Sequence, residues 1–441
     1  MKRILSFLLS VLLVAVMFAG CAGGQKLNGV NIADYTIVYS DDAPDYCKRA
    51  AEYIAAQILE RTGVTVAISE DNAGTNPHEI VVGETNRAIS QTLDAETENV
   101  EFAILADDNH IALEGDYFII AAAAYYFVET YIPGKSFQSD IPKTVSIHTP
   151  ITEKAKNFIY LIGDGMSFNH TKLLEEYEIA DFATDSDNER IFYGYYLPYQ
   201  GRVHTDSLSG VTDSAAGGTA LACGYKTLNY YVGKDKDGKD IQSLTELAVS
   251  QGKATAVLST DLMTGATPAA FSAHAMDRND SNAILSSAKV LMEKGTIMLG
   301  GLQFTDTYQD IISETLTELE ANENGFFIMY EEGYIDKFAH KMQIEDTLLH
   351  MGRFNQAIGI FMEYAFYHPD TFLIITADHE TGALMPNKDG KLEFFSNSHT
   401  GADVPIFGYG QGAEVFQDYD EENNEVPKVI AALWGVEDFG G

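Results

Sequence analysis

Six short apolar runs alternate with helical patterns in the chain beyond residue 155. These runs are predicted to be strands at 158–162, 254–259, 296–300, 326–330, 372–376 and 405–409. Segments 280–294 and 344–367 carry apolar residues at helical spacing. Apolar strands that alternate with helices are typical of a mainly parallel sheet sandwiched between helices. We therefore predict an α/β fold for residues 151–441, with functional side chains beyond the carboxyl ends of the strands.

A second, smaller α/β pattern precedes this unit and covers residues 34–150. Strands are predicted at 36–39, 64–68 and 79–83, a helix at 44–61, and a final segment at 142–150. The apolar run 117–132 is too short for a membrane span and is interrupted by Glu129, so we predict a strand end followed by a buried helix. The segments EIVVGETNR and AAAAYYFVETYI resemble small accessory domains of some bacterial secreted glycosidases. This resemblance leaves open that the unit is a module that binds glycan or cell wall.

The first 20 residues have the pattern of a signal peptide. Lys2 and Arg3 precede an apolar run, and small residues stand before Cys21 in the sequence FAGC. The pattern resembles a bacterial lipoprotein signal, which implies a lipid anchor at Cys21 and a tether over 21–33. An uncleaved anchor and an ordinary secretory signal are the alternatives. Each of the three places the folded body outside the cytoplasm, at the cell surface or in the periplasm.

The charge balance excludes one class of partner. The chain holds 28 Lys and Arg against 65 Asp and Glu, a net charge of −37. Loss of a signal that contains Lys2 and Arg3 would leave 26 of the 28 basic residues and a net charge of −39. Such a chain has no basic surface for specific nucleic-acid binding, and it repels anionic substrates at long range. An anion site must therefore reverse the sign of the charge locally.

The cysteines beyond Cys21 are Cys47 and Cys223. One disulfide between them is compatible with an oxidising compartment. Cys223 lies among small apolar residues, which favours a buried thiol instead. No cysteine spacing matches a zinc knuckle.

Candidate metal ligands stand at the ends of the predicted strands. They are Asp164, Glu331, Asp336, His340, Asp378, His379 and His399. Each one alone is typical of a turn or a surface position. Together they are expected to bring carboxylates and imidazoles to one edge of the sheet. Mixed Asp and His ligands suit zinc and oxygen ligands suit magnesium, so the pattern predicts a metal centre.

The stretch TDSAAGGTALACG at 212–224 predicts a helix that begins at the pair Asp213-Ser214. One interpretation is a simple N-cap. The other is a serine nucleophile at a helix N-terminus, where the helix dipole favours a developing negative charge. The stretch by itself does not decide between them.

A series of motifs beyond residue 155 resembles the alkaline phosphatase family. In chain order they are GDGM, TDSAAGGTA, ATPAAFSAH, LGG, EEGYIDKFAH, TADHETG and SHTG, spread over most of residues 155–415. The resemblance implies hydrolysis of small phosphate monoesters through a phosphoserine on Ser214. It implies one zinc site of Asp336, His340 and His399, a second zinc site of Asp164, Asp378 and His379, and a magnesium site of Asp164, Thr267 and Glu331. It also implies that Arg278 clamps phosphate and that Lys337 assists through water.

Two of these residues have a simpler interpretation when each is taken alone. Thr267 followed by Pro268 is typical of a helix start with Thr267 as the N-cap. Arg278 is compatible with a solvated surface position. The other motifs favour the functional roles.

The chain departs from the family pattern at several points. Gly265 stands where relatives usually have an Asp or a His near the third metal, which implies an altered magnesium site. Glu332 replaces a usual small residue beside Glu331 and is expected to add charge there. The stretch after LGG is short, so walls of the substrate pocket and the contacts of a homodimer are left open.

Three other functions remain in competition with a phosphomonoesterase. A phosphodiesterase of the same superfamily is the first, and a sulfatase is the second, although TDSAAGG lacks the sulfatase signature. The third is a surface lipoprotein whose phosphatase-like domain binds ligands without catalysis. The intact set of candidate ligands favours an enzyme.

Overall fold

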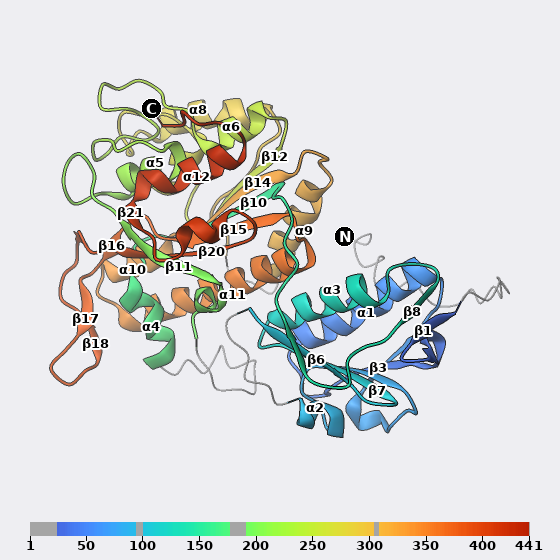
Figure 1. Cartoon of the computed structure of the whole chain (residues 1–441). Coiled ribbons are helices and arrows are strands. Elements are labelled where there is room, and N and C mark those ends of the chain that lie inside the picture. Colours follow the sequence, from blue (N-terminus) through green and yellow to red (C-terminus); the bar gives the residue numbers. More distant parts are fainter. Residues whose placement is uncertain (1–23, 94–99, 177–190, 304–307, 441) are drawn as a thin grey trace.

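Two main β-sheets organise the part of the chain that the computed structural model describes, which comprises residues 24–93, 100–176, 191–303 and 308–440 (Figure 1). The larger sheet has eight strands, in the order β13 (Ile297–Leu299), β12 (Ala254–Ser259), β14 (Phe326–Glu332), β10 (Asn157–Gly163), β15 (Thr371–Thr376), β20 (Val404–Tyr409), β11 (Tyr199–His204) and β21 (Asp420–Glu422). Neighbours from β13 to β15 are parallel, whereas β20 is antiparallel to both β15 and β11. The predicted α/β fold with a mainly parallel sheet is confirmed.

Helices cover both faces of this sheet. On one face lies α11 (Ile344–Tyr367), beside α4 (Phe168–Glu176) and α9 (Tyr308–Glu320). On the other face lie α5 (Ser214–Cys223), α6 (Leu244–Ser250), α7 (Ala266–Ser272) and α12 (Val426–Leu433), with α8 (Ser281–Glu293) packed against α7. The helices predicted at 280–294 and 344–367 are α8 and α11.

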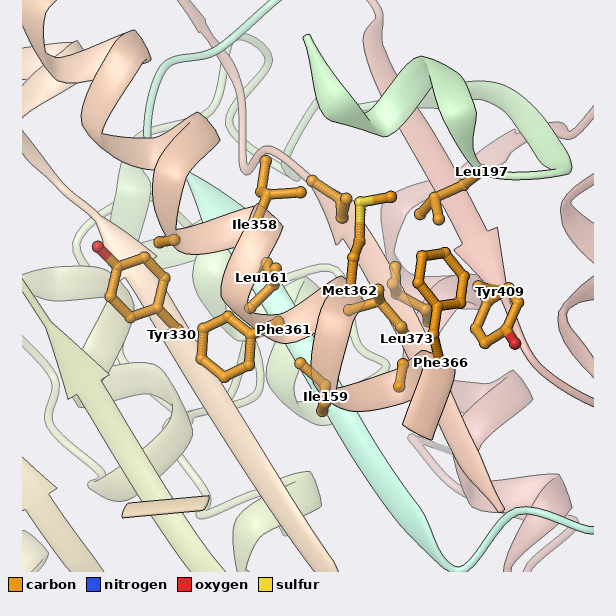
Figure 2. Close-up of a cluster of buried hydrophobic side chains, with 14 of the residues drawn as sticks. Ile159, Leu161, Leu197, Tyr330, Ile358, Phe361, Met362, Phe366, Leu373 and Tyr409 are labelled. Carbon is orange, nitrogen blue, oxygen red and sulfur yellow. The ribbon is translucent and has the colours of Figure 1, made fainter. Parts of the chain in front are cut away.

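Alternate residues of the central strand β10 show why its sequence is mainly apolar. Ile159 and Leu161 point toward Phe361 and its neighbours on α11 (Figure 2). Phe158 and Tyr160 point to the opposite face, where the Tyr160 ring meets that of Phe271 on α7 at 5.6 Å between centroids. Because both faces are buried, apolar side chains predominate on both sides of the strand.

The smaller sheet lies in the N-terminal part of the chain. Its strands are β4 (Ala67–Glu70), β3 (Thr36–Tyr39), β5 (Glu79–Val82), β7 (His110–Glu114), β6 (Phe102–Ala106) and β9 (Ser146–His148), in that order. Helices α1 (Asp45–Thr62) and α3 (Ile119–Tyr131) pack on one face, and Ile89 and Leu93 of the α2 segment (Ala88–Thr92 and the residue after it) pack on the other. The strand predicted at 64–68 begins later in the structure, at Ala67.

Helix α3 joins the two parts of the chain. It contacts β6 and β7 of its own sheet and also α11 of the larger unit. Nearby, Arg49 of α1 makes two hydrogen bonds of 2.7 Å with Glu363 of α11. The predicted buried helix in 117–132 is confirmed, but the strand end before it is wrong because β7 ends at Glu114 and Tyr117 adopts a positive φ of 47°. The division into domains at 150 and 151 stays a prediction.

The predicted tether over 21–33 is wrong in its described part. β1 (Gln25–Leu27) pairs with both β2 (Val30–Asn31) and β8 (Phe137–Ser139) in a three-stranded sheet. Leu27 and Ile32 are fully buried, so their apolar side chains hold this segment against the N-terminal unit. The signal over 1–20 and the anchor at Cys21 lie outside the described residues.

The acidic segment 418–425, which looks like an exposed loop in the sequence, forms an edge strand. β21 pairs in parallel with β11, and Asp420 lies near Arg202 at 3.7 Å and near His204 at 3.4 Å. These basic neighbours offset the acidic charge, so the segment can join the sheet. β11 was itself not predicted, because its polar residues alternate with only a few apolar ones.

Cys47 and Cys223 are both buried, and no disulfide links them. This agrees with the buried thiol that the sequence favours for Cys223. Within the described ranges, no helix combines the length and hydropathy that crossing a bilayer requires.

The small residues of α5 allow it to lie close to the strand ends. A Cβ atom added at Gly217 would lie 2.8 Å from the carbonyl oxygen of Asp378. A Cβ atom added at Gly218 would lie 3.2 Å from the Cα of Thr267 on α7. Larger side chains would push α5, and Ser214 at its start, away from the sheet edge.

We predict that Gly217→Ala destabilises the protein although alanine favours helix. The helix preference for alanine stabilises by about 1 kcal/mol, whereas overpacking against a backbone carbonyl costs about 1–3 kcal/mol. Thermal unfolding of the metal-free protein measures the difference. Gly134→Ala is the matched control, because a Cβ there meets nothing within 4 Å. Equal midpoints for the two variants would contradict the close approach of α5.

Candidate active site

Parallel strand pairing brings three candidate carboxylates to one edge of the larger sheet. Ile162 on β10 lies opposite Glu331 on β14 and Thr376 on β15. Asp164 is two residues beyond Ile162 and Asp378 is two residues beyond Thr376, so both lie at the carboxyl ends of their strands. The candidate residues thus gather where ligand sites in such sheets lie.

His399 reaches the same edge because β20 runs in the opposite direction. A residue before a parallel strand would lie at the far edge of the sheet. The short strands β16 (Glu380–Thr381) and β19 (His399–Thr400) pair antiparallel, with Thr381 opposite His399. The rings of His379 and His399 stack with centroids 3.7 Å apart.

Asp336, His340 and His399 form the first group of potential metal ligands. Asp336 lies on α10 (Tyr334–Ala339), and His340 follows one helical turn later. The Nε2 atoms of His340 and His399 lie 3.3 and 3.4 Å from Asp336 Oδ1 and 3.1 Å from each other. The structure therefore brings together the three residues predicted for one zinc.

The two imidazoles of this group present lone pairs to a common point. His340 Nδ1 lies 2.8 Å from the carbonyl oxygen of Asn397, and His399 Nδ1 lies 2.8 Å from that of Thr212. A carbonyl oxygen only accepts, so each Nδ1 carries a proton and each Nε2 is left to bind a cation or, without one, a proton. Burial acts to lower the pKa of His399, but the hydrogen bond with Asp336 outweighs burial and raises it, so without a cation its Nε2 can hold the proton that it shares with Asp336. Two lone pairs at 3.1 Å repel each other unless a proton or a cation lies between them. This donor set fits a metal such as zinc.

His379 is the centre of the second group. Its Nε2 lies 3.5 Å from Asp164 Oδ1, 3.3 Å from Asp378 Oδ2 and 3.1 Å from Ser214 Oγ. Asp164 Oδ1 is buried and accepts no hydrogen bond from the described residues. The structure also places Asp336 in this group with Asp164 and His379, so Asp336 lies between the two sets. An orphaned carboxylate oxygen beside an imidazole lone pair again fits a cation.

Burial and mutual repulsion perturb the carboxyl groups of the site. Burial, followed by the charge of Asp336, raises the pKa of Asp378 to about 6. Burial, followed by the charge of Asp261, raises the pKa of Glu331 to about 8. Burial and the charge of Asp378 raise the pKa of Asp164 well above its usual range. Cations that bind these oxygens would have to displace protons from them.

Asp336 behaves in the opposite way. Burial acts to raise its pKa, but the hydrogen bond with His399 and the neighbouring imidazoles outweigh burial and hold the pKa below its usual range. Burial also holds the pKa of His379 well below its usual range, with His399 adding to the effect. His379 therefore stays neutral, as a metal ligand must.

Ser214 is the first residue of α5, and Asp213 is its N-cap. Asp213 Oδ1 accepts a hydrogen bond of 3.0 Å from the N–H of Ala216. Because Asp213 caps the helix, the Ser214 hydroxyl is free to face His379. Ser214 is only 2% exposed. The capping interpretation of the sequence thus applies to Asp213, and the nucleophile interpretation remains for Ser214.

Asp213 also orients Arg278, a role that the sequence did not indicate. Asp213 Oδ2 accepts from the Arg278 Nη1 at 3.2 Å and from the Tyr230 N–H at 3.0 Å. Arg278 is therefore tied to the residue before Ser214, which does not fit a purely solvated position. The N-cap preference for Asp was the signal available in the sequence.

Two of the three residues predicted for magnesium, Thr267 and Glu331, have hydrogen-bond partners of their own. Thr267 is fully buried inside α7 and donates to Asp378 Oδ2 at 3.2 Å. The N-cap of α7 is Gly265, so the interpretation of Thr267 as the cap is wrong. Glu331 Oε2 accepts a short hydrogen bond from Ser259. The charge of Glu331 also acts to raise the pKa of Asp164, after the larger effects of burial, Asp378 and Asp336.

Glu332 does not add charge beside Glu331, contrary to expectation. Successive residues of a strand point to opposite faces. The Glu332 carboxylate lies 2.8 Å from His350 Nδ1 and accepts from Thr260 Oγ1 at 3.0 Å. Lys337, predicted to assist through water, makes an ion pair with Asp261 and lies 4.3 Å from the Tyr334 ring.

Known proteins resemble this chain in sequence and in fold. The family model for alkaline phosphatase matches residues 155–300 and 298–394, more than half of the chain. Alkaline phosphatase 3 of Bacillus subtilis is 27% identical over 301 residues, which are 55% of this chain and 65% of that relative. Alkaline phosphatase 4 of the same organism is 28% identical over 336 residues, 63% of this chain and 71% of the relative. The chain thus spans about two thirds of the length of these relatives.

A solved structure shows the same fold. The alkaline phosphatase from the Antarctic bacterium TAB5 has a TM-score of 0.55 and 23% sequence identity, over 65% of this chain and 99% of that chain. At this identity the likeness supports the fold alone. The family match and the gathered site residues lead to one conclusion: this chain belongs to the alkaline phosphatase family, whose members are metal-dependent hydrolases.

Proposed function

We propose that the protein hydrolyses small phosphate monoesters through a phosphoserine intermediate on Ser214, at a centre for two zinc ions and one magnesium ion. The observation that carries the proposal is the position of Ser214 Oγ, 3.1 Å from His379 Nε2 within the buried ligand set. The finer assignments of the ions rest on the family resemblance together with the donor chemistry described above.

Each ion has a proposed set of ligands in this chain. Asp336, His340 and His399 would hold one zinc, and Asp164, Asp378 and His379 would hold the other. Asp164, Thr267 and Glu331 would hold magnesium. Bound divalent cations would supply the positive charge that favours the Ser214 alkoxide and neutralises the phosphate oxygens.

His379 is close enough to Ser214 to resemble the base of a serine hydrolase, but its surroundings oppose that role. A general base needs a pKa near the working pH, and burial holds the pKa of His379 far lower. Its Nδ1 contacts the Thr381 hydroxyl at 3.2 Å, whereas the base of a triad is oriented by a carboxylate. Its Nε2 lone pair is better suited to a metal.

The binding of an anion depends on a local reversal of charge. Asp164, Glu331, Asp336 and Asp378 carry four negative charges when ionised, and Arg278 carries one positive charge. Without cations this edge would repel phosphate, as the acidic body of the protein does. With cations bound, the guanidinium of Arg278 and the first N–H groups of α5 can hold the phosphate oxygens.

The proposed reaction has two steps. Ser214 Oγ loses its proton and attacks phosphorus in line with the ester oxygen. The bond between phosphorus and that oxygen breaks, and the leaving alcohol takes up a proton. Water then attacks the phosphoserine and releases inorganic phosphate. Arg278 and the helix N-terminus stabilise the charge that spreads over the phosphoryl oxygens in both steps.

We also propose that the protein acts outside the cytoplasm and is attached to the membrane by a lipid anchor at Cys21. The signal pattern at 1–20 supports the anchor. Metabolic labelling with a fatty acid, with Cys21→Ala as the control, tests it. A homodimer is likewise a proposal that the family resemblance suggests.

Chelation is predicted to abolish turnover and phosphate binding together. Both need the cations that reverse the charge of the site. Hydrolysis of an aryl monoester, and binding of inorganic phosphate by calorimetry, are measured before and after chelation and after zinc and magnesium are restored.

The same assay on the matching diester separates the two phosphatase classes: a higher kcat/KM for the diester would identify a phosphodiesterase. Full activity without metal would favour a serine and histidine pair instead.

Ser214→Ala is predicted to lower kcat by roughly 10⁴-fold or more while phosphate binding is kept, because the nucleophile is lost and the metal ligands stay. Ser286→Ala is the control, since Ser286 bonds only to its own helix at the Asn282 carbonyl in the described contacts. Unchanged turnover in Ser214→Ala would remove Ser214 from its role. Absence of turnover in the unmodified protein, with phosphate still bound, would support a binding lipoprotein.

Arg278→Ala is predicted to lower kcat/KM by about 10²-fold to 10³-fold, the usual loss of one donor to transition-state charge. Arg278→Lys should recover only part of the loss, because an ammonium lacks the forked geometry of guanidinium. Steady-state kinetics on the monoester provides the measurement. Arg49→Ala, which breaks the ion pair with Glu363, is the control. A loss of equal size in the control would mean that Arg278 acts only through stability.

A further inference from the structure

The space beside Gly265 is filled by a side chain from elsewhere in the loop. A Cβ atom added at Gly265 would lie 2.5 Å from Asp261 Oδ2 and 2.9 Å from the Leu262 carbonyl oxygen. Gly265 is the position where the family pattern has an Asp or a His. The carboxylate of Asp261 thus occupies the place from which that side chain would extend.

The backbone of Asp261 is fixed by close contacts on both sides. Its N–H donates to Ser259 Oγ at 2.8 Å, and its carbonyl accepts from the Gly301 N–H at 2.6 Å. A Cβ atom at Gly300 would lie 3.0 Å from the same carbonyl. The LGG motif therefore holds the loop that carries Asp261, and this close contact explains why the motif has glycines at these positions.

Asp261 is linked to both sides of the metal-ligand set. Ser259 receives the N–H of Asp261 and donates its own hydroxyl proton to Glu331 Oε2. Asp261 Oδ1 makes an ion pair with Lys337, the residue after Asp336 on α10. Oδ1 also accepts from the Leu262 N–H at 2.7 Å. The second oxygen, Oδ2, faces the position of Gly265.

We propose that Asp261 replaces a carboxylate at position 265 as the outer positioning residue of the magnesium site, where it holds Lys337 and Glu331 in place and faces the hydrated cation with Oδ2. The inference rests on the proposed function, because it concerns the third ion of that site. It differs from the family pattern in the origin of the carboxylate, which comes from the chain four residues earlier.

Calorimetry of magnesium binding tests whether the site needs a charged group at this point. The measurement uses the full-length, zinc-loaded protein without substrate. Asp261→Ala and Asp261→Asn should each weaken magnesium binding by about 10-fold to 100-fold, the usual effect of an outer-sphere change, and leave the zinc content unchanged. Gly265→Asp alone should also weaken it, because the new side chain meets the Asp261 carboxylate. The double variant Asp261→Ala/Gly265→Asp should bind magnesium more tightly than either single variant.

A second double variant separates charge from the filling of space. Asp261→Ala/Gly265→Asn restores a side chain of the same size without its charge, and should not recover magnesium affinity. Asp240→Ala is the matched control, since it removes another Asp–Lys ion pair, that with Lys234. Its magnesium affinity should equal that of the unmodified protein. Thermal unfolding of every variant verifies folding, and Asp261→Asn keeps the shape of the native side chain if alanine unfolds the loop.

Three results would overturn the inference. They are unchanged magnesium affinity in both Asp261 variants, equal rescue by Asn and Asp at position 265, and absence of magnesium binding in the unmodified protein. None of these depends on turnover. A protein that binds magnesium through Asp261 but hydrolyses no monoester would overturn the proposed function and leave the inference in place.

Discussion

Four carboxyl groups buried at one edge of a sheet impose the constraint on which the rest of the structure depends. Asp164, Glu331, Asp336 and Asp378 are at most 7% exposed, and water cannot screen their charges from one another. The pKa values of three of these groups are raised. The pKa of Asp336 is lowered instead, because of its imidazole neighbours. Cations that bind these oxygens would favour the ionised form of all four carboxyl groups together.

The scaffold directs the lone pairs of this site inward. Backbone carbonyls of Asn397 and Thr212 accept the Nδ1 protons of His340 and His399, so both Nε2 atoms face Asp336. Asp213 caps α5 and leaves the hydroxyl of Ser214 free. The absence of a side chain at Gly217 lets that helix approach Asp378. In each case a backbone or capping contact settles the orientation of a functional side chain.

The loop from Ser259 to Gly265 joins the separate parts of the site. Asp261 lies between Lys337 on α10 and the hydrogen bond that holds Glu331. The ion pair of Asp261 with Lys337 adds no net charge at this place, although position 265 has no side chain. The departure of the sequence from its family at Gly265 and the presence of Asp261 are therefore best understood as one change rather than two.

The sequence by itself determined the strands and helices whose patterns are local, such as β12, α8 and α11, and it identified the residues that gather at the site. Their order in the motifs carried that information. The tertiary structure alone decided the direction of β20, which brings His399 to the carboxyl edge, the face to which Glu332 points, and the pairing of acidic β21 with β11. It also revealed Asp213 and Asp261 as partners of Arg278 and Lys337. The physical reason is that periodicity and turn residues depend on neighbours in the chain, whereas strand direction and ion pairing depend on contacts between segments far apart in sequence.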